Sequence, residues 1–276
     1  MQVLTEAEAL APHPASVVSI GMFDGVHRGH RSVLAQLRAR GDALGLPTVV
    51  VTFDPHPRAV VTPQRAPSLL GTLDQRLALL ADTGAADACM VIRFDQARSA
   101  QPVEEFVDHT LLALLGMRGL VVGENFACGH RRKGDIPYLR QAGLHKGFTV
   151  SPIALRLASE AGSDVVCSST HVRELVSAGE VKRATAVLGR PYALSGTVLS
   201  SERGLAVRLP ARMCLPASDD YDGVVADAEG RWVPAVLQVR DDLCDVRPLA
   251  QPSPGFAPGQ QVQLRFGARR AQVEAA

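Results

Sequence analysis

The chain has 276 residues, of which 46% are hydrophobic, and its 29 basic and 28 acidic residues give a formal net charge of +1. This length allows one large or two modest domains with a buried core. The almost neutral charge gives no reason to expect a nucleic-acid partner. No apolar run reaches the roughly 18 residues that predict a membrane-spanning helix, so we expect no membrane partner.

Residues 1–10 carry acidic side chains rather than the basic and apolar pattern of a secretory leader, which favours a cytoplasmic protein. The five cysteines are odd in number and scattered, and no CxxC pair occurs, which argues against a zinc site or a disulfide framework. We predict that each is a small packed hydrophobic residue. They are Cys89, Cys128, Cys167, Cys214 and Cys244.

The most informative stretch is SIGMFDGVHRGH at residues 19–30. A β-branched run at 17–20 precedes it and a helical apolar pattern follows it, so the sequence predicts a strand, a tight glycine loop and a helix. This layout presents backbone N–H groups and a helix N-terminus to a phosphate. His27 and His30 lie three residues apart and would share one helix face. Two imidazoles there suit the polyanionic transition state of a phosphate transfer.

Spacing alone leaves open a metal pair or two surface histidines, but the whole string favours a nucleotide site. Residues 21–30 resemble the GxFDGxHxGH signature of the HxGH nucleotidyltransferases. The resemblance implies that His27 and His30 are catalytic. It also implies a nucleotide-binding loop made of Gly21, Met22, Phe23, Asp24 and Gly25.

Residues 46–53 read as a buried parallel strand that ends in the sequence DPHP at 54–57. The two prolines stop the strand and hold His56 and Phe53 at the carboxyl edge of the sheet, where ligands bind in open α/β folds. A merely rigid loop is the alternative interpretation. The string also resembles the TFxPHP element of bacterial FAD synthetases, which favours a binding role that includes Pro55 and Pro57.

Helical patterns at 69–83, with Thr72 as N-cap, and at 102–117 alternate with strand patterns at 89–92, 120–123 and 148–153. This alternation predicts a doubly wound parallel sheet. Asn125 and Phe126 follow a strand end, where an amide and an aromatic ring suit a flat heterocycle. Residues 122–135 resemble the VGxDFxFGxxRxGD element of FAD synthetases. Asn125 replaces the commoner Asp, and Cys128 stands where an aromatic residue is usual.

The stretch SSTHVR at 168–173 is predicted to open a helix that runs towards Gly179. Hydroxyl groups at a helix start cap free N–H groups, and this structural role is one interpretation. Arg173 follows Thr170 by three residues, so hydroxyls, helix dipole and guanidinium together suit a phosphate group. The stretch resembles the SSTxIR motif of the same family. That resemblance implies that Ser168, Ser169, Thr170 and Arg173 bind the triphosphate, with Arg173 also catalytic.

Five motifs in order, over about residues 15–200, resemble the FMN adenylyltransferase module of the bacterial bifunctional riboflavin kinase/FMN adenylyltransferases. The resemblance implies a Rossmann-like HxGH nucleotidyltransferase domain at 1–188, which uses ATP with Mg²⁺ and FMN as substrates and gives FAD. Asp24 is a candidate ligand of the Mg²⁺ ion, but no residue is assigned as a metal ligand. The implied flavin-binding residues are Phe53, Pro55, His56, Pro57, Asn125 and Phe126.

From about residue 192 the pattern changes to short alternating strands at 194–199, 205–209, 223–226, 232–239 and 262–266, with a hairpin turn at 228–231. These predict a small antiparallel β-barrel at 189–276, in the position of the family's riboflavin kinase module. Residues 208–213, RLPARM, align with the family's GxPTAN loop but carry neither its hydroxyl nor its amide. A hard cation needs such oxygen ligands. We therefore predict a degenerate barrel without riboflavin kinase activity.

Two alternatives stay open at this point. The acceptor is either FMN or another phosphorylated molecule, such as a flavin analogue, since Asn125 and Cys128 depart from the family pattern. A catalytically silent sensor of flavin or nucleotide is the second alternative, because one of the two sites is altered. The sequence does not indicate the oligomeric state.

Overall fold

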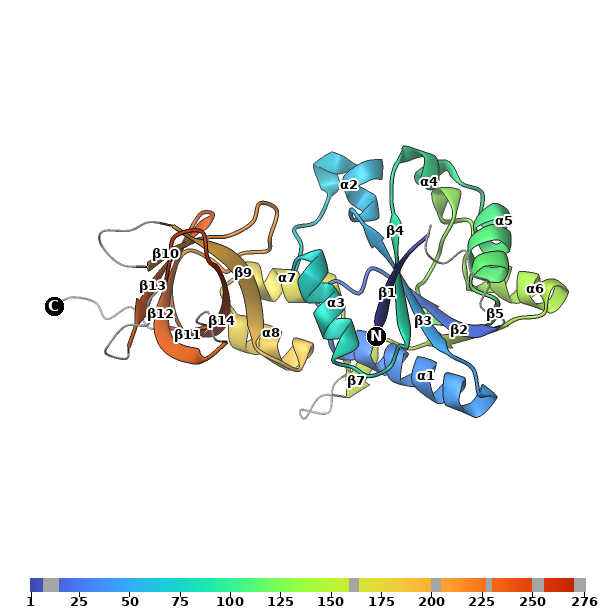
Figure 1. Cartoon of the computed structure of the whole chain (residues 1–276), viewed down its shortest axis with the longest axis horizontal. Coiled ribbons are helices and arrows are strands. Elements are labelled where there is room, and N and C mark those ends of the chain that lie inside the picture. The colour runs from blue at the N-terminus through green and yellow to red at the C-terminus, as the bar shows by residue number, and fades with distance from the viewer. Residues whose placement is uncertain (7–14, 159–163, 200–204, 227–229, 250–255, 271–276) are drawn as a thin grey trace. The chain divides into compact units, whose positions relative to one another are not determined.

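A computed structural model describes residues 1–6, 15–158, 164–199, 205–226, 230–249 and 256–270 (Figure 1). The chain packs into two compact units, residues 1–67 with 73–166 and residues 68–72 with 167–276. These two units are defined by packing. The division into functional domains at 1–188 and 189–276 stays a prediction.

The first unit is built on a six-stranded parallel sheet of order β1-β4-β3-β2-β5-β6. The strands are β1 (Gln2–Thr5), β2 (Ser16–Ile20), β3 (Thr48–Asp54), β4 (Ala88–Arg93), β5 (Met117–Gly123) and β6 (Thr149–Ile153). Every neighbouring pair runs parallel. The sheet confirms the predicted Rossmann-like α/β fold, in which strand β1 was not foreseen.

Helical segments connect these strands and cover both faces of the sheet. They are α1 (Arg28–Leu44), α2 (Pro57–Val61), η2 (Pro63–Arg65), α3 (Leu73–Ala81), α4 (Gln96–Ala100), α5 (Val103–Glu105), the π-helical η3 (Phe106–Leu114), η4 (His130–Arg132) and α6 (Ile136–Lys146). Val50 packs on the side of Leu34 and Leu37, whereas its neighbours Val49 and Val51 pack with the η3 side chains. Alternate strand residues therefore feed two separate cores. A short antiparallel pair, β7 (Arg156–Ala158) and β8 (Asp164–Val166), follows β6.

Two predicted helices have different bounds in the structure. The predicted helix at 69–83 begins only at Leu73, because Leu69 bonds through its backbone to residues 212 and 214. The predicted helix at 102–117 ends at Leu114, and Met117 already belongs to β5. Helices α4 and α6 have no counterpart among the predictions.

The second unit holds two helices, α7 (Ser169–Ser177) and α8 (Val181–Leu188), and a closed antiparallel barrel of order β10-β13-β12-β11-β14-β9. The barrel strands are β9 (Tyr192–Leu199), β10 (Leu205–Arg208), β11 (Asp220–Ala226), β12 (Trp232–Arg240), β13 (Leu243–Pro248) and β14 (Gln261–Arg269). The barrel confirms the predicted architecture. The prediction did not include strand β13. Of the predicted hairpin turn at 228–231, the first two residues lie outside the described residues.

Side chains pack the barrel interior, with Tyr192, Tyr221 and Phe266 among the largest fully buried groups. The barrel wall is tight at Gly196, where a Cβ atom would lie 2.5 Å from Val207 Cγ1 and 2.6 Å from Arg208 O. A substitution at this glycine therefore forces the two strands apart.

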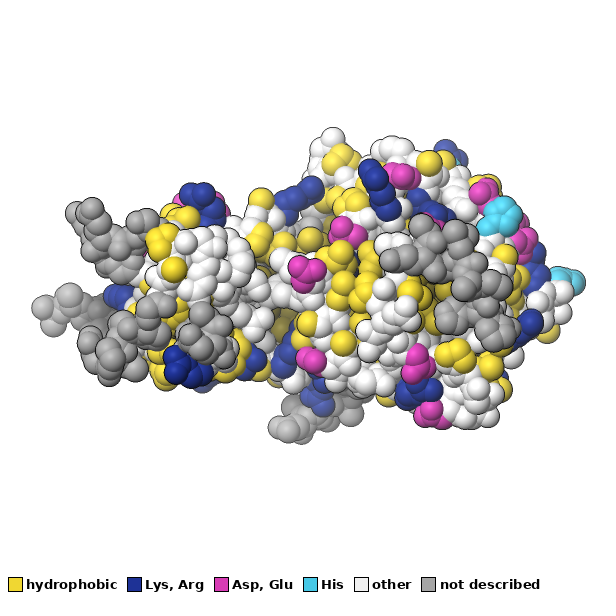
Figure 2. All heavy atoms as spheres, viewed as in Figure 1, with side chains coloured by type: hydrophobic (Ala, Val, Ile, Leu, Met, Phe, Trp, Pro, Cys, Tyr) yellow, Lys and Arg dark blue, Asp and Glu magenta, His cyan; other side chains and the backbone are white. Residues whose placement is uncertain are grey.

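Basic and acidic side chains lie interspersed on the face of the molecule that Figure 2 shows. Within the part of the chain that the structure describes, no helix is both long enough and apolar enough to cross a membrane.

A polar cluster ties three elements together at the end of the first sheet opposite the strands' carboxyl edge. Asp87, just before β4, accepts hydrogen bonds from the Thr48 backbone N–H at 2.8 Å, from Thr48 Oγ1 at 3.0 Å and from Arg38 Nη1 of α1 at 3.0 Å. The bond from the Thr48 backbone N–H is the main cause that lowers the pKa of Asp87 below its usual value. The cluster therefore stabilises the charged carboxylate.

We expect Asp87→Ala to lower the free energy of unfolding by about 1 kcal/mol near pH 7, since the half-exposed carboxylate is partly screened by solvent. Because the folded pKa of Asp87 is depressed, its stabilisation is present above the unfolded value of about 4 and is lost as pH falls through the folded value. Urea titrations near pH 7 and near pH 3 should therefore show the largest difference from wild type at the higher pH. Asp82→Ala, at an exposed position just after α3, is the matched control. An equal loss at both pH values would contradict the assignment.

Candidate functional site

The loop between β2 and α1, residues 21–27 (the histidine loop), has a strained backbone. Phe23 and Val26 adopt positive φ values of 49° and 35°, and Gly25 has a φ of 76°. Positive φ is rare for non-glycine residues, most of all for a β-branched one, and costs on the order of 1–3 kcal/mol. Both Phe23 and Val26 are buried, so packing holds the loop in this form. Strain maintained by packing is typical of functional loops.

The two histidines meet at the start of α1, as their spacing predicts. His27 is the N-cap, and its Nδ1 accepts a hydrogen bond from the His30 backbone N–H at 3.2 Å. The imidazole rings stack, with centroids 3.6 Å apart and planes 18° from parallel. A ring nitrogen that accepts carries no proton, so a neutral His27 holds its proton on Nε2, within a ring that is 1% exposed.

A cavity of about 750 Å³ opens in the first unit beside the carboxyl ends of the strands. Five of the six predicted flavin-side residues line it, namely Phe53, His56, Pro57, Asn125 and Phe126. Pro55 is not among the lining residues. Of the predicted nucleotide-binding loop, Gly21 and Met22 line the cavity, whereas Phe23, Asp24, Gly25, His27 and His30 do not. The cavity therefore adjoins the start of the histidine loop.

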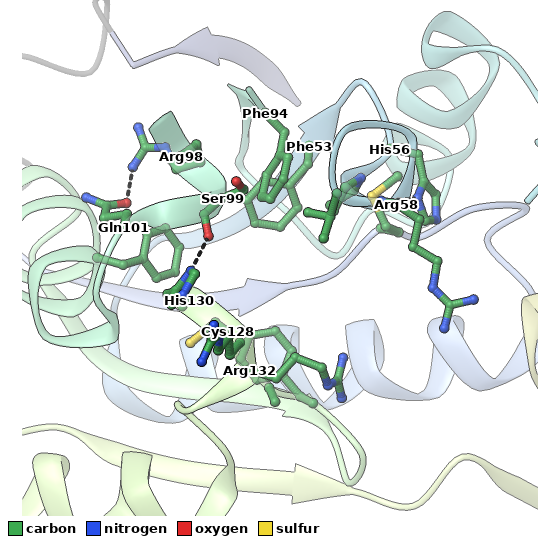
Figure 3. Close-up of a pocket in the computed structure, with 18 of the residues that line it drawn as sticks. Phe53, His56, Arg58, Phe94, Arg98, Ser99, Gln101, Cys128, His130 and Arg132 are labelled. Atoms are coloured by element: carbon green, nitrogen blue, oxygen red, sulfur yellow. Dashed lines mark hydrogen bonds between the residues drawn. The ribbon is translucent and has the colours of Figure 1, made fainter. Parts of the chain in front are cut away.

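The lining combines aromatic rings with positive charge (Figure 3). Its aromatic members are Phe53, Phe94, Phe106 and Phe126, and its basic members are Arg58, Arg98, Arg131 and Arg132, with His56 and His130. Among the described residues that line the cavity, none is Asp or Glu. In Figure 3, Arg58 of α2 lies on the side of the cavity opposite to Gln101, whereas Arg132 of η4 lies next to Cys128. Such a lining suits a flat aromatic ligand that carries negative charge.

The loop after β5 forms one wall of the cavity and is fixed at several points. The His130 backbone N–H donates to Gln101 O at 2.9 Å, and its ring nitrogen Nδ1 lies 3.1 Å from Ser99 O. Arg132 Nη2 donates to Asn125 O at 3.1 Å, which closes the loop on itself. Arg131 and Arg132 have positive φ values of 53° and 59°, a second strained site beside the cavity.

The buried guanidinium of Arg76 joins the histidine loop to strand β3. Arg76 Nη1 donates to Met22 O at 3.2 Å, and Nη2 donates to Phe53 O at 3.0 Å. Burial lowers the pKa of Arg76, and the nearby Asp24 and Asp54 carboxylates oppose that shift. Arg76 therefore fixes the backbone of the histidine loop relative to strand β3.

The cysteines pack as predicted. Four of the five are buried and all are free thiols. Cys128, which lines the cavity, is half-buried, and burial raises its pKa to about 12. A protonated thiol is a poor nucleophile, so Cys128 contributes to the cavity as an apolar surface.

The predicted phosphate-binding turn belongs to the second unit. Ser168 is the N-cap of α7, and its Oγ accepts from the His171 backbone N–H at 3.1 Å, which confirms its capping role. Thr170 is exposed and Ser169 is half-buried at the helix start. Arg173 Nε donates to Ser68 O at 2.6 Å. Because this turn and the histidine loop lie in different units, their joint action on one ligand stays a prediction.

Sequence reasoning missed several residues of the cavity and of the backbone that supports the histidine loop. Arg76 lies four residues before Leu80 on the buried face of α3. A cation within an apolar helix stripe is an unusual feature that could have indicated it. Phe94 directly follows β4 at the carboxyl edge, which is a similar signal. Ser99, Gln101 and Phe106 carried no signal, because only the folded chain brings them to the cavity.

Comparisons with known proteins match this picture. The sequence model of the FAD synthetase family matches residues 10–170. A bifunctional riboflavin kinase/FMN adenylyltransferase of Pseudomonas fluorescens is 39% identical over 204 residues, 74% of this chain and 64% of the relative. The protein of that name from Escherichia coli K12 is 35% identical over 201 residues, 72% of this chain and 63% of the relative. The match thus spans less than two thirds of each relative.

One solved structure is similar over the whole chain. The crystal structure of a macrolide-efflux protein from Streptococcus pneumoniae covers 100% of this chain and 94% of its own, with a TM-score of 0.81 and 21% sequence identity. At this identity the similarity concerns the fold alone.

We expect Arg76→Met, which keeps the aliphatic length but removes both donated hydrogen bonds, to lower the free energy of unfolding by about 2–4 kcal/mol. The Met22 and Phe53 carbonyl oxygens would each lose a charged donor. Urea titration followed by far-UV circular dichroism measures the change. Arg118→Met, at an exposed position of β5, should cost less than about 0.5 kcal/mol. Equal effects of the two substitutions would refute the role assigned to Arg76.

Proposed function

Because the chain belongs to the FAD synthetase family, we propose that it transfers AMP from ATP to FMN and so gives FAD and pyrophosphate. Residues 1–188 form the proposed adenylyltransferase module, and we place the protein in the cytoplasm. The observation that carries the proposal is the cavity with aromatic rings and basic side chains that begins at Gly21 and Met22 of the histidine loop. It suits the isoalloxazine ring and the phosphate of FMN.

The reaction forms one bond and breaks one. A phosphate oxygen of FMN attacks the α-phosphorus of ATP, and the bond from that phosphorus to the β-phosphate oxygen breaks as pyrophosphate leaves. The attacking oxygen is already an anion near neutral pH, so the step requires no general base. The protein must hold the two phosphates together and stabilise the added negative charge.

The histidine loop would stabilise that charge. The buried His27 ring stacks on the half-buried His30 ring at the positive end of α1, and both imidazoles are proposed to donate to this charge. Ser169, Thr170 and Arg173 are proposed to hold the β- and γ-phosphates and the pyrophosphate that leaves. Ser168 contributes mainly as the cap of α7. Phe53, His56, Asn125 and Phe126 would bind the flavin.

Mg²⁺ is expected with the triphosphate, whose oxygens supply most of the ligands for such an ion. Asp24, the carboxylate of the histidine loop, does not fit the role of a metal ligand. It is 2% exposed and lies close enough to Arg76 to oppose the lowering of that guanidinium's pKa by burial. Among the described residues, no group of three or more His, Cys, Asp or Glu side chains is arranged to hold a metal. We therefore assign no step and no protein ligand to Mg²⁺.

We further propose that the barrel lacks riboflavin kinase activity. The loop at 209–214 (the barrel loop) has no side-chain hydroxyl or amide. Its backbone groups are also engaged, since Leu209 N–H donates to Asp242 O and Arg212 O accepts from Leu69 N–H. Both features are unfavourable for a bound magnesium nucleotide.

The direct test is to incubate the full chain with ATP and Mg²⁺ and with either FMN or riboflavin, and to separate the flavins by chromatography. We expect FAD from FMN and no FMN from riboflavin. FMN formation from riboflavin would show that the barrel is an active kinase. If FMN yields no FAD, pyrophosphate release with other phosphorylated acceptors distinguishes a different acceptor from a silent sensor, and either result overturns FMN as the substrate.

We expect His30→Ala to lower kcat by about 100-fold or more, because one donor to the transition state is lost. Steady-state FAD formation at saturating FMN measures the effect. His145→Ala, on the exposed side of α6, is the control and should leave kcat unchanged. Near-wild-type turnover in His30→Ala would exclude His30 from the mechanism.

A further inference from the structure

Residues 68–72 (the crossing segment) form part of the second unit, although both flanking stretches of chain belong to the first. Leu69 pairs with the barrel loop through two backbone hydrogen bonds. Leu69 N–H donates to Arg212 O at 2.7 Å, and Cys214 N–H donates to Leu69 O at 2.7 Å. The next residue, Leu70, is 4% exposed. The crossing segment is therefore a built-in element of the barrel unit.

This pairing leads directly to Arg173. The carbonyl oxygen of Ser68, one residue before Leu69, accepts the hydrogen bond from Arg173 Nε at 2.6 Å. A guanidinium group is planar, so fixing its Nε edge also fixes the plane in which its two terminal nitrogens lie. The position of the Ser68 carbonyl therefore sets the orientation of the Arg173 fork.

Cys214 connects the barrel loop to the same helix. Its Sγ lies 3.7 Å from the backbone oxygen of Arg173 and 3.6 Å from Ser177 Oγ. Its own carbonyl oxygen accepts from the Tyr192 hydroxyl at 2.6 Å in the buried interior. The residue is 1% exposed. Cys214 thus contacts α7, the first barrel strand and the crossing segment at once.

The barrel loop also has an unusual backbone. Arg212, whose carbonyl oxygen accepts from Leu69, has a φ of 67°. A non-glycine residue keeps this conformation only where its surroundings determine it. Here the bond from Leu69 N–H to Arg212 O, with the neighbouring bond from Cys214 N–H to Leu69 O, holds the backbone in this form.

We propose that the barrel loop and the crossing segment position Arg173 for the triphosphate, and that Cys214 and Tyr192 are positioning residues for this arginine. The proposal rests on the proposed function, which makes Arg173 a ligand of the β- and γ-phosphates. The loop that aligns with the family's kinase loop then serves the adenylyl transfer by holding a side chain of that site.

The first test introduces Cys214→Val, which adds a branched carbon against the Arg173 backbone. Cys244→Val is the matched control, since Cys244 is an equally buried cysteine of the same barrel whose Sγ lies near Asp245 O. Calorimetric titration of the full chain with ATP and Mg²⁺ measures affinity, and titration with FMN is the internal reference. We expect Cys214→Val to weaken ATP binding by about tenfold, as a small displacement of a binding group does. Cys244→Val should leave it within about twofold.

A double-mutant cycle separates positioning from general destabilisation. If Cys214 acts through Arg173, the pair Cys214→Val with Arg173→Ala should bind ATP no more weakly than Arg173→Ala alone. If the two substitutions weaken ATP binding independently, so that their fold-losses in affinity multiply in the double variant, the proposal is overturned. Tyr192→Phe, which removes only the hydroxyl bonded to Cys214 O, replaces Cys214→Val if that variant does not fold. It should show the same non-additivity with Arg173→Ala.

FAD formation by the unmodified chain is measured in parallel, so the two proposals can fail separately. ATP binding that depends on Cys214 through Arg173, without FAD formation, would support the positioning role and refute the adenylyl transfer. FAD formation with equal ATP affinity in Cys214→Val and Cys244→Val would refute the positioning role alone. An unmodified chain that binds no ATP would refute both.

Discussion

The architecture of the first unit depends on one buried cation that holds the histidine loop against strand β3. Arg76 donates to the carbonyl oxygen of Met22, in the histidine loop, and to that of Phe53, the second-last residue of β3. Parallel strands leave their last carbonyl groups without partners at the carboxyl edge, which is also the edge where ligands bind. Near this edge a single guanidinium donates to two carbonyl groups at once, and Thr52 Oγ1 also donates to Met22 O. The site can therefore form beneath a ligand without depending on the ligand for its shape.

The same edge carries backbone strain. Phe23 and Val26 in the histidine loop, and Arg131 and Arg132 after β5, all have positive φ values. Each strained pair is held by packing or by hydrogen bonds to its surroundings, as the Arg132 bond to Asn125 illustrates. Loops fixed in this way present N–H groups and side chains in one arrangement, so little reorganisation is required when charge develops on a phosphate.

The fold was largely predictable, because continuous apolar runs such as those of β2 and β3 are specific to buried parallel strands. The histidine loop was predictable for a different reason, since its glycines and histidines are adjacent in sequence. The start of α3 was not predictable, because Leu69 and Leu70 continue the helical apolar pattern while the backbone groups of Leu69 bond to the barrel loop. Strand β13 was missed because Asp245 and Arg247 interrupt its short apolar run. Ser99, Gln101 and Phe106 meet at the cavity only through tertiary folding.

The two units use the same means to fix an important arginine. In the first unit, Arg76 is held by the carbonyl oxygens of Met22 and Phe53, and in the second, Arg173 is held by that of Ser68. A carbonyl oxygen of the main chain is present whatever the side chain, so these acceptors survive substitution at their own positions. Their location depends on the backbone, and therefore on elements far away in sequence, such as the pairing of Leu69 with residues 212 and 214. A reaction that needs positioned charge and no general base can therefore tolerate considerable change in side chains, as long as the backbone that orients its cations is kept.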